Sequence, residues 1–298
     1  MDYNAFKNKL LQCVKSKLEN AEIRNYTKNN SIEKEGIYIY EEGKNFNPLI
    51  HLDDLYGLYQ LTGDMDGVAE LVFEMARTTS GNIDVQAILG SWENAQSRLT
   101  VHLINSAWNQ KFLQDIPHRN LLDLSFVAYM DFDKSADGVV GMAVTSGMIQ
   151  KWGIDEETLF QTALSNLHKE EFIIRDMEEV IQELREEKRK PTPYDGINYI
   201  MTNPEGQFGA RGMLRTDLLI QFAETVHEDL YILPDSINDI ILTPAIKELT
   251  DEDLSDMMAV IKVFNKPEQD SLSDNMYYFS RESGAISIYT PKTEEAVL

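Results

Sequence analysis

The clearest pattern of hydrophobic and polar positions lies in residues 216–244, TDLLIQFAETVHEDLYILPDSINDIILTP. Apolar residues at helical spacing in its first part predict a helix, with Thr216 or Asp217 at the N-cap. The continuous apolar run 230–233 is too short for a surface helix and predicts a buried strand that ends at Pro234. A second apolar run follows a polar turn. We therefore expect a helix and two strands in this order.

Similar patterns predict elements over most of the chain. Apolar residues at three- and four-residue steps predict helices at 3–18, 53–59, 66–77, 110–116, 153–168, 177–187 and 250–264. Shorter apolar runs predict strands at 21–28, 36–42, 48–52, 100–105, 121–130, 139–144, 197–202, 208–214, 276–280 and 285–289. Asp155 and Thr250 are the predicted N-caps of two helices, the second with Asp253 in a capping box. These elements favour an α+β fold with mixed, mostly antiparallel sheets and packed helices.

The chain has 298 residues, a length between one large domain and two ordinary ones. The best boundary is 185–196, REEKRKPTPYDG, which combines a charge run with two prolines and a glycine. It predicts an N-terminal α+β lobe, 1–190, and a C-terminal α+β lobe, 191–298. A solvated loop within one continuous domain explains the same segment.

Acidic residues outnumber basic ones, 50 to 27, giving a formal net charge of −23. A surface this negative repels phosphate backbones and anionic lipid, so we expect neither direct nucleic acid binding nor a membrane partner. Asp217 to Leu298 holds 17 acidic and 5 basic residues, or −12 of that charge. This acidity indicates either simple solubility or a face for a basic protein partner, including a mimic of nucleic acid charge.

A single cysteine, Cys13, excludes an internal disulfide and fits a reducing compartment. The N-terminal pattern is that of an amphipathic helix and not of a signal peptide. No stretch approaches the ~18 apolar residues of a membrane span. We therefore expect a cytoplasmic protein.

The densest polar cluster is in QDIPHRNLLDL, with Asp115, His118, Arg119 and Asp123. A histidine near a carboxylate can act as a general base, and an arginine can hold an anion. Asp115, His118 and Arg119 are therefore the catalytic candidates, although no nucleophile accompanies them. The same residues could instead cap a helix and begin a buried strand.

The segment with Asp133, Ser135, Asp137 and Gly138 has the opening rhythm of a calcium-binding loop. The twelfth position of such a loop supplies a bidentate carboxylate, but here it is Val144. The flanking residues also have strand patterns. The segment is therefore predicted to be a polar hairpin turn.

Metal and cofactor motifs are absent from the sequence. The remaining histidines do not have the spacing of a zinc site: His51, His102, His168 and His227. Gly206, Gly209 and Gly212 form neither a dinucleotide fingerprint nor a phosphate-binding loop. A tight hairpin with a close backbone approach explains the glycines, and we expect no metal and no cofactor.

Several blocks resemble, in matching order over nearly the whole chain, a family of uncharacterised proteins from anaerobic Gram-positive gut bacteria. They are TKNN with GIYIY, IPHRNLLDLSFVAYM, KWGIDEETLFQTALSN, YIMTNPEGQFGARGML, DLYILPDSINDIILTP and LSDNMYYFSR. The family is named only as a domain of unknown function. The resemblance supplies no site residues; it favours one co-evolved unit and suggests carriage on mobile elements. Relatives are expected to have SSIHE where this chain has DSIND, which argues against a shared catalytic turn.

The leading hypothesis is a non-enzymatic protein-interaction or regulatory module with an acidic surface in its C-terminal third. One alternative is an inhibitor, or nucleic acid mimic, that acts on a basic enzyme. Another is a hydrolase or transferase centred on His118. Unrelated functions share the same folds, so the fold class alone does not decide between them.

Overall fold

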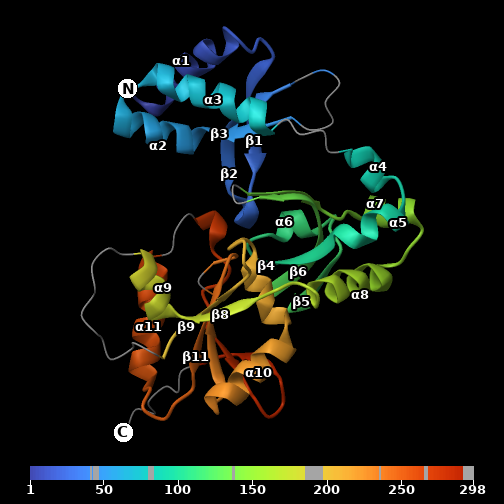
Figure 1. Ribbon diagram of the computed structural model, residues 1–298, viewed down its shortest axis with the longest axis vertical. Coiled ribbons are helices and arrows are strands. Elements are labelled where there is room, and N and C mark those ends of the chain that lie inside the picture. Colours follow the sequence, from blue (N-terminus) through green and yellow to red (C-terminus); the bar gives the residue numbers. More distant parts are fainter. Residues whose placement is uncertain are drawn as a thin grey trace. The chain divides into compact units, whose positions relative to one another are not determined.

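The computed structural model describes residues 1–40, 42, 47–79, 84–135, 138–184, 197–234, 236–264 and 268–290. The chain divides into two compact units, Met1–Ala95 and Gln96–Leu298 (Figure 1). Both contain helices and antiparallel strands, so the predicted α+β fold class is confirmed. The predicted boundary at 185–196 lies outside the described residues and stays a prediction.

The N-terminal unit is a three-stranded antiparallel sheet, ordered β1-β2-β3, with helices packed on it. Its strands are β1 (Ala21–Thr27), β2 (Glu33–Ile39) and β3 (Leu49–His51), with a 3-10 turn, η1 (Asn29–Ser31), after β1. Its helices are α1 (Tyr3–Lys15), α2 (Leu52–Thr62), α3 (Met65–Thr79), α4 (Val85–Leu89) and α5 (Trp92–Ala95).

The core of this unit follows from the alternation along β2. Ile37 and Ile39 point to the same face because successive strand residues alternate between faces. Both side chains are buried and belong to one apolar cluster with Phe6, Leu10 and Val14 of α1. The helical spacing of those three residues is what places them on the inner side of α1.

The C-terminal unit begins with a second antiparallel sheet, ordered β4-β6-β5, in which β7 also pairs with β6. Its strands are β4 (Leu99–Asn105), β5 (His118–Leu121), β6 (Leu124–Ser135) and β7 (Gly138–Ala143). The short helices η2 (Gln96–Arg98), α6 (Gln110–Leu113), α7 (Ser146–Trp152) and the longer α8 (Glu156–Leu167) accompany it. The predicted hairpin of β6 and β7 is confirmed.

The sequence interpretation of 121–130 as one strand is wrong. The chain turns between Leu121 and Leu124, so that β5 and β6 form a tight hairpin. Leu122 occupies the left-handed region with φ of 58°. Because leucine rarely adopts this conformation, its apolar side chain suggested a strand that continues.

The third sheet has six strands in the order β13-β12-β10-β11-β9-β8. They are β8 (Ile173–Asp176), β9 (Tyr199–Thr202), β10 (Leu230–Leu233), β11 (Ile240–Pro244), β12 (Tyr277–Phe279) and β13 (Ile286–Ile288). The accompanying helices are α9 (Met177–Leu184), η3 (Gly209–Leu214), α10 (Thr216–Val226), α11 (Asp251–Phe264) and η4 (Glu268–Asp270).

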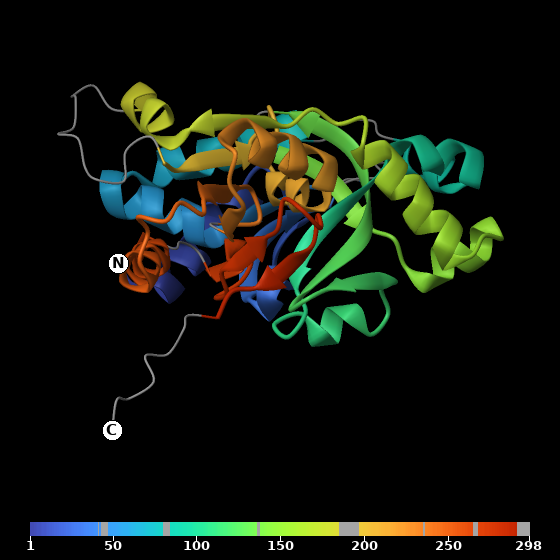
Figure 2. The same ribbon diagram turned by 90° about the horizontal axis from the view of Figure 1, so that it is seen from below.

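Both faces of this sheet are packed. Leu230 and Ile232 of β10 share a buried cluster with Leu219 of α10. Leu233 of the same strand lies in a different cluster with Leu254 of α11. Since successive strand residues point to opposite faces, α10 and α11 cover opposite faces of the sheet, as can be followed in Figure 2.

Two of the three predicted helix caps are present. The side chain of Asp155 accepts a hydrogen bond from Thr158 N at 2.8 Å. Thr250 and Asp253 form the reciprocal bonds of a capping box. The prediction for α10 is wrong, because Arg215 precedes this helix without a side-chain cap.

The prediction of a strand at 208–214 is also wrong, because Phe208 is followed directly by the 3-10 helix η3. Phe208 lies in the left-handed region, with φ of 54°, which ends the extended backbone. A Cβ at Gly209 would lie 2.4 Å from Thr202 Oγ1 and 2.5 Å from Asn238 O. The expected close backbone approach is therefore present, but it belongs to a packed turn and not to a hairpin.

The packing predicts that Ile232→Ala destabilises the C-terminal unit. The side chain is fully buried in the cluster that β10 shares with α10. The substitution loses contacts and leaves a cavity, so the free energy of unfolding should fall by about 2–4 kcal/mol. Hydrogen exchange of the β10 and β11 amides measures this loss. The control Ile288→Ala, at a side chain 39% exposed on β13, should cost less than about 1 kcal/mol, and equal losses would contradict the assignment of the core.

Candidate functional site

The predicted catalytic residues do not converge on one site. His118 and Arg119 are consecutive residues of β5, paired with Val127 and Phe126 of β6. Their side chains therefore point to opposite faces of the sheet. Asp115 is exposed, and its backbone oxygen accepts hydrogen bonds from Ser146.

The individual contacts of these residues are local. His118 Nδ1 lies 2.9 Å from the backbone oxygen of Ile116. Arg119 donates to Glu156 at 2.9 Å and stacks over the ring of Phe160 at 4.6 Å. Arg119 thus joins β5 to the first turn of α8, which accounts for its position without a substrate.

Asp123, from the same sequence cluster, has a different and long-range role. Its carboxylate accepts hydrogen bonds from Ser273 Oγ at 2.7 Å, Asn275 Nδ2 at 3.1 Å and Tyr277 OH at 2.9 Å. These bonds tie the turn between β5 and β6 to the segment that enters β12. Burial is the main cause that raises the pKa of Tyr277. The hydroxyl therefore stays protonated and donates to Asp123.

The two loop motifs have structural positions as well. Asp133 pairs with Val140 in the hairpin of β6 and β7, and Asp137 lies outside the described residues. Gly206 N bonds to Asn203 O in the turn after β9. Across the residues that the structure describes, no three His, Cys, Asp or Glu side chains are placed to hold a metal ion.

A buried stack of rings lies at β4, where the sequence showed only a single histidine. The imidazole of His102 is stacked between Tyr129 and Phe208, with ring centroids 4.0 and 3.9 Å away. Its Nε2 lies 3.9 Å from Oδ1 of Asp131 on β6. Burial, and after it Asp131, raises the pKa of Tyr129 to about 12.

A buried ion pair lies beside this stack. Arg211 of η3 donates to Glu170 at 2.8 Å, and its side chain is only 3% exposed. The other oxygen of Glu170 accepts from Thr100 Oγ1 at 2.7 Å. Thr100 is two residues before His102 on β4, so both side chains are on the same face of the strand.

The ring stack at His102 and the ion pair of Arg211 with Glu170 hold the segment 208–214 against the edge strand β4. Phe208 stacks on His102, whereas Met213 shares a cluster with Leu103, whose side chain points to the other face. The segment therefore packs against β4. His102 is 4% exposed with both ring faces covered, so the arrangement holds structure and does not present a reactive group.

One group of exposed carboxylates in the C-terminal unit lies around the helices that cover one face of the six-stranded sheet. The sequence of α9 contains three glutamates and no basic residue, and α11 contains four acidic residues and one lysine. Both helices contribute side chains to the cluster on the same face of the six-stranded sheet, through Met177 and Leu254. We call the exposed carboxylates around them the acidic face: Glu179, Glu183, Glu248, Asp251, Glu252 and Asp256.

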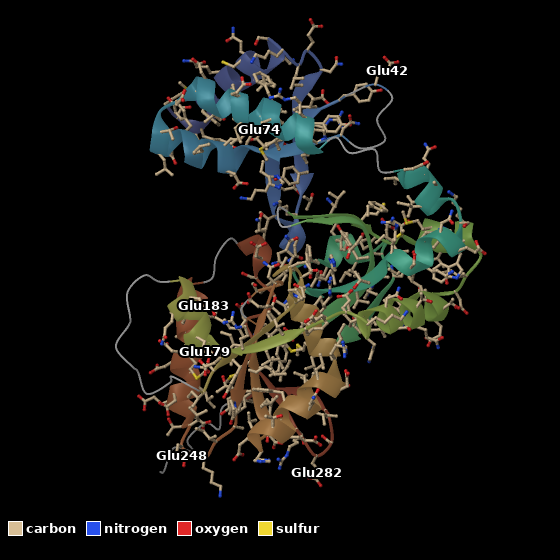
Figure 3. All side chains as sticks on the ribbon, in the orientation of Figure 1. Glu42, Glu74, Glu179, Glu183, Glu248 and Glu282 are labelled. Atoms are coloured by element: carbon tan, nitrogen blue, oxygen red, sulfur yellow. The ribbon has the colours of Figure 1, made fainter. Side chains whose placement is uncertain are left out.

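Figure 3 labels three residues of the acidic face, Glu179, Glu183 and Glu248, which lie beside α9 and α11. Glu183 forms an ion pair with Arg175 at 2.5 Å, which lowers the pKa of the Glu183 carboxyl. Asp251 instead accepts a hydrogen bond from the hydroxyl of Tyr289.

Removal of the buried cation at Glu170 should be costly. The side chain of Glu170 is only 19% exposed, and Arg211→Ala removes the cation that pairs with it. The substitution should lower the free energy of unfolding by about 3 kcal/mol. The control Arg119→Ala removes an exposed pair and should cost about 1 kcal/mol or less. Urea unfolding measures both, and a larger loss for Arg119→Ala would contradict the role given to the Arg211 pair.

Stability should fall at alkaline pH in part through Tyr129. The folded protein holds this proton more tightly than the unfolded chain, because its pKa is about 12 instead of 10.0. The resulting stabilisation is complete below the unfolded pKa and is lost as pH rises through the folded pKa. Tyr129→Phe should therefore have a shallower alkaline loss of stability than the wild type in urea unfolding, and parallel curves would show that Tyr129 does not contribute.

Comparison with known proteins places the chain in a family without assigning an activity. Within the described ranges, every helix is too short or too polar to pass through a lipid bilayer. No curated protein and no solved structure matches the chain. The model of a family of unknown function, DUF5688, matches residues 3–281. The chain therefore belongs to the DUF5688 family.

Proposed function

We propose that this protein is a non-enzymatic cytoplasmic module that binds a basic protein through the acidic face. The observation that carries the proposal is the gathering of exposed carboxylates on α9, α11 and the residue Glu248 before it. Opposite potentials steer partners together and select among them, whereas a surface of one sign repels similar molecules. A basic protein is the class of partner that this surface favours.

The distribution of charge supports a surface more than a catalytic centre. The catalytic candidates around His118 point to different faces of β5, and His102 is covered by rings. The carboxylates of α9 and α11 are, in contrast, exposed to solvent. An acidic surface is also the feature that a mimic of nucleic acid needs, and competition by DNA for the partner would identify that form of the same function.

The proposal also includes a reducing compartment, the cytoplasm, and a bacterial host. A single cysteine fits the cytoplasm, and the sequence blocks resemble proteins of anaerobic Gram-positive gut bacteria. Carriage on mobile elements would fit a module that acts on a protein of its host. The lysate of such a bacterium is therefore the source from which to recover the partner.

The expected result concerns a triple variant of the acidic face, Glu179→Gln with Glu248→Gln and Glu252→Gln. All three side chains are exposed, so the fold should be kept while the surface loses three charges. Each charge should contribute a few tenths of a kcal/mol or more to the binding free energy. The captured partner should therefore bind the triple variant about tenfold more weakly. Affinity recovery with the tagged full chain measures this, with a wash at ~0.5 M salt to release partners held by charge.

The matched control neutralises three exposed glutamates elsewhere in the same unit, Glu171, Glu205 and Glu224, by the same change to glutamine. The control makes the net charge less negative by the same amount but leaves the acidic face intact. Its partner should therefore bind nearly as in the wild type. Full binding by both variants, or equal weakening of both, would refute a role for this face.

A further inference from the structure

Three tyrosines form an aromatic surface beside the acidic face. Tyr231 lies in β10, Tyr278 in β12, and Tyr289 directly after β13. The ring centroid of Tyr231 is 5.7 Å from that of Tyr278 and 5.1 Å from that of Tyr289, at interplanar angles of 63° and 78°. All three side chains are half-buried. We call them the tyrosine platform.

The register of the sheet places the platform on the α11 side. Tyr231 and Tyr278 are direct partners across β10 and β12, so their side chains share a face. Tyr289 N bonds to the backbone oxygen of Met276, which brings the third ring to the same end of the sheet. Tyr231, Tyr289 and Met276 belong to the cluster that includes Leu254 of α11. The platform thus continues the surface from which the acidic face projects.

The hydroxyl groups of the platform are held by carboxylates. Tyr278 donates a hydrogen bond to Asp229, and Tyr289 donates one to Asp251. The bond to Asp229, and after it burial, raises the pKa of Tyr278 to about 12. The phenols therefore remain neutral at physiological pH, and their rings keep the electron-rich faces that attract cations.

The carboxylates beside the rings, Asp229 and Asp251, are held by phenols within the part of the chain that the structure describes. Among the described residues, no lysine or arginine forms an ion pair with Asp229 or Asp251. Their partners are the two phenols and, for Asp229, the backbone N–H of Arg281. Negative charge thus adjoins aromatic faces, and both features favour a cation at the same place.

We propose that the tyrosine platform binds an arginine side chain of the partner protein. The proposal rests on the proposed function and names the chemical group that the surface recognises. The ring centroids of Tyr231 and its two neighbours are 5.1 and 5.7 Å apart in edge-to-face geometry. A flat guanidinium can lie on an outer ring face and donate to a neighbouring carboxylate at the same time, which a lysine cannot do as well.

Short glycine–arginine repeat peptides are the probe for this site. Titration of the full chain, followed by tyrosine fluorescence or calorimetry, should show binding of the arginine peptide and weaker binding of the matched lysine peptide. A peptide with citrulline in place of arginine keeps the shape but lacks the charge, and should not bind detectably. Equal affinity for the arginine and lysine peptides would overturn the proposal, because charge alone would then explain binding.

Removal of a ring tests the same site from the protein side. Tyr231→Leu should weaken binding of the arginine peptide about two- to fivefold, as expected for the loss of one cation–π contact. Tyr231→Phe keeps the ring and should bind as the wild type does. Tyr40→Leu, at a tyrosine 48% exposed in the N-terminal unit, is the control for loss of an exposed tyrosine. Unchanged binding by Tyr231→Leu would overturn the proposal.

The result remains decisive if one variant fails to fold. Tyr289→Leu changes a residue outside the regular strands and supplies the second test, with the same weakening expected. The outcomes also separate this inference from the proposed function. If ring loss has no effect but the acidic-face variant loses the captured partner, the platform is overturned and the acidic face stands. If the acidic-face variant keeps its partner, the proposed function fails whatever the peptides show.

Discussion

The six-stranded antiparallel sheet, apolar on both faces, is the constraint on which the C-terminal unit depends. A strand such as β10 must place Leu230 and Ile232 on one side and Leu233 on the other, because its residues alternate. Each face then needs a cover to remove this apolar surface from water. α10 supplies the cover on one side, and α9 with α11 supplies it on the other. Their outer surfaces remain in solvent, where carboxylates are stable without partners.

The position of the tyrosine platform follows from the same constraint. α11 packs on the sheet through Leu254, near Leu233 and Met276. Tyr231 and Tyr278 lie on the same face and remain half-exposed, with their rings on the sheet and their polar ends toward water and carboxylates. The acidic face and the platform are therefore two consequences of one packed layer. This continuity is the reason to treat them as one surface for a partner.

Much of the fold follows from local patterns. The cap at Asp155, the capping box of Thr250 and the strand that ends at Pro234 depend on neighbours within a few residues, and the structure has all three. The errors come from backbone that tertiary contacts determine, as at Leu122 and Phe208, which adopt left-handed conformations in apolar runs. From local spacing alone, an apolar residue within such a run predicts a strand.

The long-range contacts could not be predicted from the sequence for a related reason. Asp123 and its partner Ser273 are 150 positions apart, and His102 meets Phe208 only because the segment 208–214 packs against β4. The spacing of residues along the chain predicts neither of these contacts. The short apolar runs 230–233 and 276–280 predicted strands, but only the register shows that Tyr231 and Tyr278 are partners. The concentration of acidic charge, in contrast, was visible in the residue counts.

The most direct test of the account is hydrogen–deuterium exchange of the full chain, free and bound to the basic protein recovered from the host lysate. Binding should slow exchange in α9, α11 and the hairpin of β12 and β13, because these elements carry the acidic face and the tyrosine platform. Exchange in α10, on the opposite face of the sheet, should not change. Slower exchange confined to the N-terminal unit, or to the sheet that contains β4 and β6, would contradict the account.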